Sequence, residues 1–247
     1  MNKSSMGIVF LGVLSGCIYA ESVIADRPGF STGTYSVHPG KFNIEMGYNY
    51  TFDKTSTKND TQDFPLFELR TGITEDIEFD LLWDGWSYTK DGVKEHSSDM
   101  TIGGKYRVLK EDMYNITFMV LVTLPTGSQS DFQTQNISPL IGLLWDYTID
   151  ESISLFGTIQ SSTYKEQKRI YDLQTAIGVT WNHTENFASF IEAYSILPSS
   201  SSISKEYVVD GGFTYLIQEN IQLDINGGIG LNRESNNFLG AGIAVTF

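Results

Sequence analysis

Charged side chains recur at every second position in several segments whose other residues are apolar. In residues 77–83, for example, Glu78 and Asp80 alternate with Ile77, Phe79 and Leu81. A period of two places the charged set on one face of a β-strand and the apolar set on the other. The charged residues predicted to line an enclosed face in this way are Glu45, Glu68, Arg70, Glu78, Asp80, Asp84, Lys105, Arg107, Asp146, Asp210 and Asp224.

Two kinds of chemistry fit such a set. Charges in a confined space are costly unless they are paired or hydrated, so Arg70, Lys105 and Arg107 could pair with neighbouring carboxylates and brace the fold. Alternatively, because acidic residues outnumber basic ones, the face could line a passage that favours cations or hydrogen-bonding solutes. The two roles can coexist, and the sequence leaves both open.

Catalysis is a competing class that the histidines do not support. A phospholipase-like barrel would need a His on a strand face near the outer rim, within reach of a Ser. His38 precedes the strands, and His183 falls in a predicted short turn. His96 falls in a predicted long loop beside residues 97–99, where an acid/His pair of the barrel-protease kind could form, but a lone loop His is far more often solvated. We therefore expect no enzyme and no catalytic residue.

Composition excludes several other classes. The 247 residues carry 16 basic and 30 acidic side chains, a net charge of −14, which repels nucleic acid. One Cys and three His argue against a disulfide or a Cys/His metal cluster. No Gly-rich loop joins a strand to a helix, so we expect no nucleotide, metal or other cofactor. The sequence has no run of 18 consecutive apolar residues, so we expect no membrane-spanning helix.

The alternating pattern extends along most of the chain. It is clear in residues 41–52, where Phe42, Ile44, Met46 and Tyr48 alternate with polar residues. Similar segments are 77–83, 100–108, 114–124, 137–147, 173–181, 221–229 and 239–247, with weaker copies at 66–74, 152–160, 187–196 and 207–216. This predicts an all-β fold of about twelve strands, each close to the roughly 9–11 residues that cross a bilayer when tilted.

The connections alternate between short and long. Short turns are expected near 74–76, 110–112, 149–151, 183–186 and 217–220, and longer polar loops near 53–63, 85–98, 125–136, 161–171 and 197–205, with a shorter one near 231–237. This asymmetry predicts an antiparallel transmembrane β-barrel of the outer-membrane type, with a narrow bore and both chain ends on the short-turn side. A soluble sandwich or lipocalin-like barrel would also alternate, but would not account for the one-sided loops. Aromatic residues expected to form a girdle at the short-turn rim are Tyr106, Trp145, Tyr147, Trp181, Tyr215 and Phe247.

The first 25 residues form a predicted signal peptide. Lys3 precedes an apolar run from Met6 to Leu14, and cleavage after Ala20 or Ala25 suits the small residues there. Alternatively, residues 14–17 resemble a lipobox, with Cys17 as the lipidated residue. Either route takes the chain out of the cytoplasm. Residues 26–40 are too irregular for a strand, and residues 41–247 would form the barrel.

Two motifs resemble known outer-membrane proteins. The opening Asp26-Arg27-Pro28-Gly29, continued through Gly33 and followed by Pro39-Gly40, resembles the bacterial family named for the MetA pathway of phenol degradation, as do residues 124–127 and the closing residues 240–242. The terminal Phe247 resembles the C-terminal signature of bacterial outer-membrane barrels. The family resemblance covers nearly the whole mature chain and implies an outer-membrane transporter for aromatic compounds. It carries over no set of functional residues.

The expected function is passive passage of small solutes, aromatic or hydrophobic ones among them, across the outer membrane of a Gram-negative bacterium. The alternative is a structural or adhesive barrel with a closed lumen. Residues 26–40 could fold into the lumen as a plug, with Arg27 against the acidic wall, or hang in the periplasm. The expected partners are outer-membrane lipid, the solute, and the periplasmic chaperones and barrel assembly machinery that act during insertion.

Overall fold

The computed structural model describes residues 22–55, 59–89, 95–128, 136–165 and 168–247. The predicted signal peptide, apart from its last four residues, and Cys17 lie outside these ranges. Within them, no helix has the length and hydropathy needed to cross a membrane.

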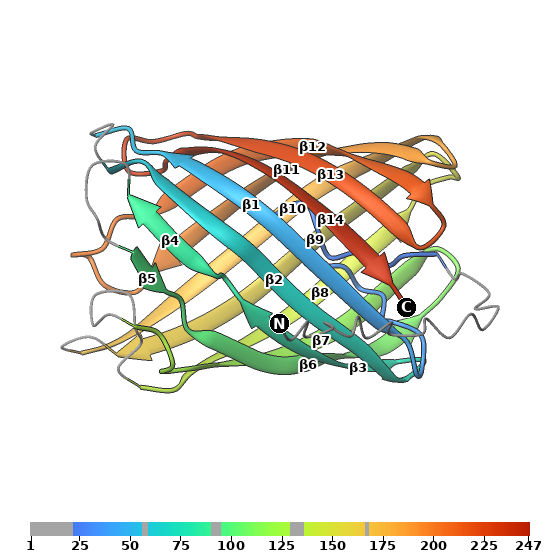
Figure 1. The fold of residues 1–247 in the computed structure, drawn as a ribbon, viewed down its shortest axis with the longest axis horizontal. Helices are drawn as coiled ribbons and strands as arrows, with labels where there is room; N and C mark the ends of the chain where they lie inside the picture. The colour runs from blue at the N-terminus through green and yellow to red at the C-terminus, as the bar shows by residue number, and fades with distance from the viewer. Residues whose placement is uncertain (1–21, 56–58, 90–94, 129–135, 166–167) are drawn as a thin grey trace, which may run out of the picture.

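Fourteen strands form one antiparallel sheet in the described residues (Figure 1). They are β1 (Phe42–Phe52), β2 (Thr61–Thr74), β3 (Ile77–Trp83), β4 (Trp86–Thr89), β5 (Glu95–Ser97), β6 (Met100–Lys110), β7 (Tyr114–Leu124), β8 (Ser138–Thr148), β9 (Ile153–Lys165), β10 (Arg169–Thr184), β11 (Phe187–Pro198), β12 (Glu206–Gln218), β13 (Ile221–Gly230) and β14 (Asn237–Thr246).

The sheet closes on itself because β1 pairs with both β2 and β14. Two of the strands are continuations of others: β4 follows β3 along β2 without a change of register, and β5 precedes β6 in the same way. The break between β3 and β4 lies at Gly85, whose φ of 68° suits glycine. The wall is therefore a closed barrel of twelve antiparallel strands, as the alternating pattern predicts.

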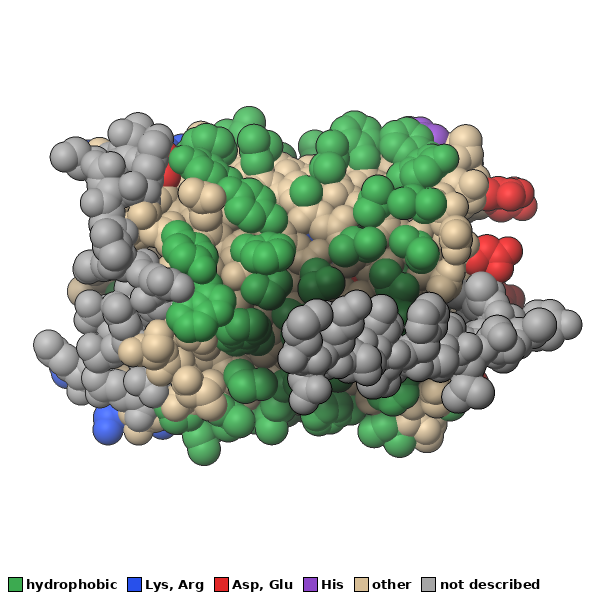
Figure 2. Space-filling view, in the orientation of Figure 1, with side chains coloured by type: hydrophobic (Ala, Val, Ile, Leu, Met, Phe, Trp, Pro, Cys, Tyr) green, Lys and Arg blue, Asp and Glu red, His purple; other side chains and the backbone are tan. Residues whose placement is uncertain are grey.

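The barrel buries polar residues and exposes apolar ones. Along β1, Asn43 and Glu45 are fully buried, whereas Phe42 and Met46 are 48% and 42% exposed. Figure 2 shows hydrophobic side chains spread over the outer wall on the face in view. This inversion suits a bilayer, because the outer face meets lipid and backbone groups must be paired within the wall.

Short turns and long connections lie at opposite ends of the barrel. Connections such as residues 75–76 and 219–220 have two residues, whereas residues 125–137 separate β7 from β8 at the other end. Phe42 and Phe247 exchange backbone hydrogen bonds of 3.3 and 2.9 Å, so the start and end of the barrel meet at the short-turn rim.

Two predicted loops are wrong. Residues 85–98 contain β4 and β5, and residues 161–171 are largely taken up by the ends of β9 and β10. The reason is that a hairpin can extend beyond the bilayer, where its outer face meets water and needs no apolar residues. At the end of β9, residues 161–163 are all polar, so backbone pairing continues there without an apolar alternation. In β4 the alternation is present but short, because Trp86 and Tyr88 are exposed on either side of buried Ser87.

Aromatic residues lie at the rims. Tyr106, Tyr147, Trp181, Tyr215 and Phe247 are all exposed on the short-turn side. Trp145, predicted to join them, is only partly exposed, because its ring packs over Gly157 of the neighbouring strand. Exposed rings at the headgroup level favour a fixed depth in the membrane.

A charged side chain on the outer face should destabilise the barrel. Ile177, in the middle of β10, is 58% exposed. Replacing it with Arg should lower the free energy of folding into lipid vesicles by about 2–4 kcal/mol, because a charge at the membrane midplane loses its hydration. The measurement is reversible denaturant unfolding in vesicles. Glu185→Arg, in a short turn, is the control, and an equal loss in both variants would contradict a membrane-facing position for Ile177.

Candidate functional site

The N-terminal segment (residues 26–40) lies inside the barrel. Its backbone is bound by side chains that point inward from strands on different sides of the wall. The Phe30 amide donates a 2.8 Å hydrogen bond to Glu192 on β11, and the Val37 amide donates a 2.7 Å bond to Glu78 on β3. Contacts on opposite sides fix the path of a segment that has no regular structure of its own.

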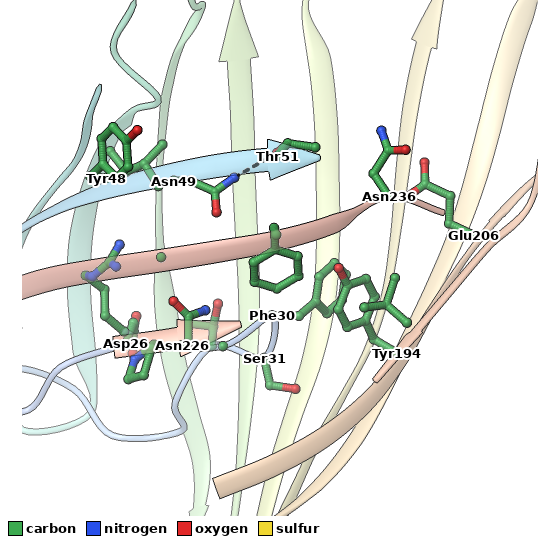
Figure 3. Close-up of a pocket in the computed structure, with 18 of the residues that line it drawn as sticks. Asp26, Phe30, Ser31, Tyr48, Asn49, Thr51, Tyr194, Glu206, Asn226 and Asn236 are labelled. Atoms are coloured by element: carbon green, nitrogen blue, oxygen red, sulfur yellow. Dashed lines mark hydrogen bonds between the residues drawn. The ribbon is translucent and has the colours of Figure 1, made fainter. Parts of the chain in front are cut away.

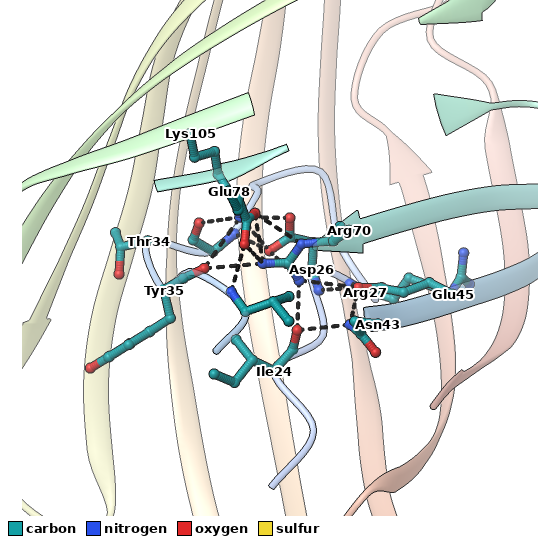
Figure 4. Close-up of polar contacts among 12 residues, drawn as sticks. Ile24, Asp26, Arg27, Thr34, Tyr35, Asn43, Glu45, Arg70, Glu78 and Lys105 are labelled. Atoms are coloured by element: carbon teal, nitrogen blue, oxygen red, sulfur yellow. Dashed lines mark hydrogen bonds and ion pairs between the residues drawn. The ribbon is translucent and has the colours of Figure 1, made fainter. Parts of the chain in front are cut away.

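Two buried cations hold the centre of this arrangement (Figure 4). Arg70 on β2 and Lys105 on β6 are fully or almost fully buried. Arg70 lies 3.2 Å from Glu45 and 3.0 Å from Glu78, and Lys105 Nζ lies 2.9 Å from Glu78. One ionic cluster thereby joins β1, β2, β3 and β6, which are neighbours in the wall.

Asp26 brings the N-terminal segment into this cluster. Its carboxylate lies 2.8 Å from Lys105 Nζ and 3.3 Å from the Arg70 guanidinium. Its backbone amide donates a 2.9 Å hydrogen bond to Glu45. A buried cation needs close anionic partners, so Asp26 both satisfies the wall and anchors the segment.

Arg27 fixes the segment to a second part of the wall. Its guanidinium lies 3.2 Å from Asp224 on β13, donating from two nitrogens. A Cβ atom at Gly47 or Gly242 would lie 2.1 or 2.3 Å from this guanidinium. These glycines face each other across β1 and β14, so the wall leaves room for the Arg27 side chain where a larger residue would collide with it.

The other predicted lumen residues lie in different surroundings. Arg107 binds Asp76 at 3.2 Å near the short-turn rim. Asp146 accepts a hydrogen bond from Asn115 at 2.9 Å and another from the Thr34 hydroxyl. Asp84 is exposed in the break between β3 and β4. These three are therefore outside the central cluster.

Three predicted carboxylates have no salt bridge in the described part of the chain: Glu68, Asp80 and Asp210. Asp80 is 2% exposed and its Oδ1 has no hydrogen-bond partner there. Asp210 is 3% exposed, and both of its oxygens lack a partner among the described residues. The lumen therefore holds more carboxyl groups than cations to pair with them.

The N-terminal segment divides the lumen space. An outer chamber of about 490 Å³ extends toward the long-connection end, where Thr51, Glu206 and Asn236 line it (Figure 3). An inner chamber of about 310 Å³ lies toward the short-turn end, where Ser154 and Asn182 line it. Residues 26–28, 31 and 32 line both chambers, so the segment is the partition between them.

Tyr35 sits on the inner side of this partition. Burial raises the pKa of its phenol, and the nearby Asp146 carboxylate raises it further. The phenol therefore stays neutral and accepts a 3.2 Å hydrogen bond from Asn115.

Several residues of the site were missed by sequence reasoning. Glu192 binds both Phe30 and Ser31 amides, yet it lies in residues 187–196, where the alternation is weak. The available signal was the charged side chain of Glu192 at an inward-facing position of that segment. Gly47 and Gly242 gave no signal of their own, because only the strand register places them beside Arg27.

His183 is not placed as a phospholipase-like site would require. His183 belongs to β10 rather than to a turn, and its Nε2 lies 2.7 Å from Ser189 Oγ. Both groups are near the short-turn rim, away from the outer rim that a phospholipase-like site would need. The side chain of His96 lies outside the described residues. Within the described ranges, no group of three His, Cys, Asp or Glu residues could hold a metal ion.

Comparisons with known proteins agree with this architecture. The family model described as "Putative MetA-pathway of phenol degradation" matches residues 25–247. No curated protein sequence matches the chain.

Among solved structures, an outer membrane channel from Pseudomonas putida F1 is similar, with a TM-score of 0.69 and 11% identity over 89% of this chain and 100% of that one. The NanC porin gives 0.60 and 9% identity over 83% and 98%, and the KdgM porin gives 0.57 and 10% over 83% and 99%. At these identities the likeness establishes the fold, a porin-like outer-membrane barrel.

Removing a cation from the ionic cluster should destabilise the barrel. Arg70→Met should destabilise the barrel by about 3–5 kcal/mol, because it leaves buried carboxylates without their cation. Arg107→Met is the matched control, since its partner Asp76 is 46% exposed and such a pair contributes at most about 1 kcal/mol. Denaturant unfolding of both variants is the measurement. Similar small losses would show that the cluster does not brace the barrel.

Proposed function

This chain belongs to the MetA-pathway of phenol degradation family, and on that premise we propose that it is a passive channel for small solutes in the outer membrane of a Gram-negative bacterium. Aromatic and hydrophobic compounds are among the solutes. The observation that carries the proposal is the polar lumen with a chamber on each side of the N-terminal segment. The porin-like fold favours a channel over an enzyme.

The geometry supports selection by charge. Solutes entering the outer chamber meet Glu68 and Glu206, and behind them Asp210 and Glu192 add negative charge. A narrow lumen with low-dielectric walls focuses this field, so cations and neutral hydrogen-bonding solutes enter more readily than anions.

The N-terminal segment acts as a plug in this proposal. It separates the chambers, so continuous passage requires either a path beside it or its displacement. Its anchors are the ion pairs of Asp26 and Arg27 and the hydrogen bonds from the segment's backbone amides to Glu78 and Glu192. Outer-membrane lipid surrounds the apolar belt, and periplasmic chaperones and the barrel assembly machinery act during insertion.

A structural or adhesive barrel with a closed lumen is the second candidate. The observation that favours it is the same segment, because it lies across the lumen between the two chambers. Solute passage separates the two candidates.

Single-channel recording in planar bilayers tests the plug. The mature protein should conduct in steps, and deletion of residues 26–40 should raise conductance severalfold, because the partition between the chambers is removed. Heat-modifiable migration on gels controls for folding. Unchanged conductance after the deletion would contradict the plug, and a folded wild type and deletion variant that both fail to conduct would favour the structural barrel.

Ion selectivity tests the role of the acidic wall. Under a KCl gradient, the reversal potential of the wild type should indicate a preference for K⁺. Glu68→Gln combined with Asp210→Asn should lower the cation-to-anion permeability ratio about twofold, because two uncompensated carboxylates are lost. Glu151→Gln combined with Glu185→Gln, an equal charge change in two exposed short turns, is the control. A ratio that is the same in all three proteins would rule out selection by this wall.

A further inference from the structure

The outer chamber has the features of a binding site as well as of a passage. Its floor is the N-terminal segment, including Phe30, and its walls come from strands far apart in sequence. Its volume of about 490 Å³ exceeds that of a single-ring organic molecule. A solute arriving from the long-connection end therefore reaches a closed-bottomed chamber before it meets the partition.

Carboxylates dominate the charge of this chamber. Glu68, Glu206 and Glu234 line it, and no Lys or Arg lies within ion-pair distance of Glu68 or Glu206 in the described part of the chain. The only described cation among the lining residues is Arg27, and its guanidinium is engaged by Asp224. A positively charged ligand would therefore find unneutralised anionic partners, whereas an anion would be repelled.

An aromatic pair stands within the same chamber. Phe30 and Tyr194 stack with ring centroids 4.2 Å apart and an interplanar angle of 7°. Figure 3 shows the Phe30 ring beside the Tyr194 ring of the wall. Aromatic rings attract cations and stack with other rings, so a pair beside carboxylates suits a ligand with both properties.

Further negative charge lies behind the aromatic pair. Glu192, Glu206 and Asp210 are all close enough to Tyr194 to act on its hydroxyl electrostatically. Among polar lining groups, the Asn226 Oδ1 atom is buried and has no hydrogen-bond partner among the described residues.

From these features we infer that the outer chamber binds a small organic cation, an aromatic amine or aromatic quaternary ammonium compound. The charged group lies near Glu206 and Glu68, and the ring of the ligand lies against Phe30 and Tyr194. This inference rests on the proposed function only for the ligand's arrival and onward passage; binding itself can be measured without transport.

The test is equilibrium binding to the folded mature protein in detergent, measured by titration calorimetry. The probes are benzyltrimethylammonium, neutral benzyl alcohol and anionic benzoate, which share one ring and differ in charge. We expect saturable binding of benzyltrimethylammonium, at least tenfold tighter than of the other two, because charge and ring both contribute. Absence of saturable binding, or equal binding of the cationic and neutral probes, would overturn the inference.

Variants locate the site. Glu206→Gln should weaken binding of benzyltrimethylammonium about fivefold, and Tyr194→Leu about tenfold, because one removes a carboxylate and the other a ring. Glu151→Gln, outside the chamber, should leave the affinity unchanged. Equal affinities in all four proteins would overturn the placement of the ligand in this chamber.

The planar-bilayer recordings separate this inference from the channel function. Conductance without preferential binding of benzyltrimethylammonium would leave the channel proposal standing and remove the cation site. Selective binding by a protein that does not conduct would keep the cation site and remove the channel.

Discussion

The pairing of Arg70 and Lys105 with carboxylates from both the wall and the N-terminal segment is the interaction on which the lumen depends. Neither cation can remain buried without close anions, and the wall supplies Glu45 and Glu78. Asp26 completes the set from the segment. The requirement to satisfy two buried charges thus determines where residues 26–40 lie, and that position in turn creates the two chambers.

The barrel wall and its polar lining follow from short-range pattern, and this is why they could be predicted. Alternation along residues 77–83 assigns Glu78 and Asp80 to the interior once lipid is the outer solvent. The ends of the hairpins could not be predicted in the same way, because residues 161–163 of β9 are all polar and β4 alternates over only four residues. A long apolar alternation therefore marks the part of a strand that lies in the membrane, not the full length of the strand.

The placement of the N-terminal segment depends on contacts between residues distant in sequence. Arg27 meets Asp224 only because closure of β1 on β14 brings that wall together, and Gly47 faces Gly242 for the same reason. Glu192 lies in a strand with weak alternation and gains its role from the backbone of Phe30 and Ser31. The sequence predicted an acidic wall with Arg27 against it. Which residues meet depends on the register of the strands, and no local sequence signal specifies that register.

The charges of the lumen divide into two groups with different physical roles. Glu45, Glu78 and Asp26 are tied to cations, so they stabilise the fold and hold the segment. Glu68, Glu206 and Asp210 make no salt bridge in the described residues, and removing such carboxylates even partly from water costs folding free energy. A fold that needed only stability would be better served by neutral side chains at these positions. We propose that Glu68 and Glu206 act instead on solutes that enter the outer chamber, where Phe30 and Tyr194 supply the aromatic surface. The N-terminal segment belongs to both groups, because Asp26 anchors it while Phe30 faces the chamber, and so it connects the stability of the barrel to the chemistry of its entrance.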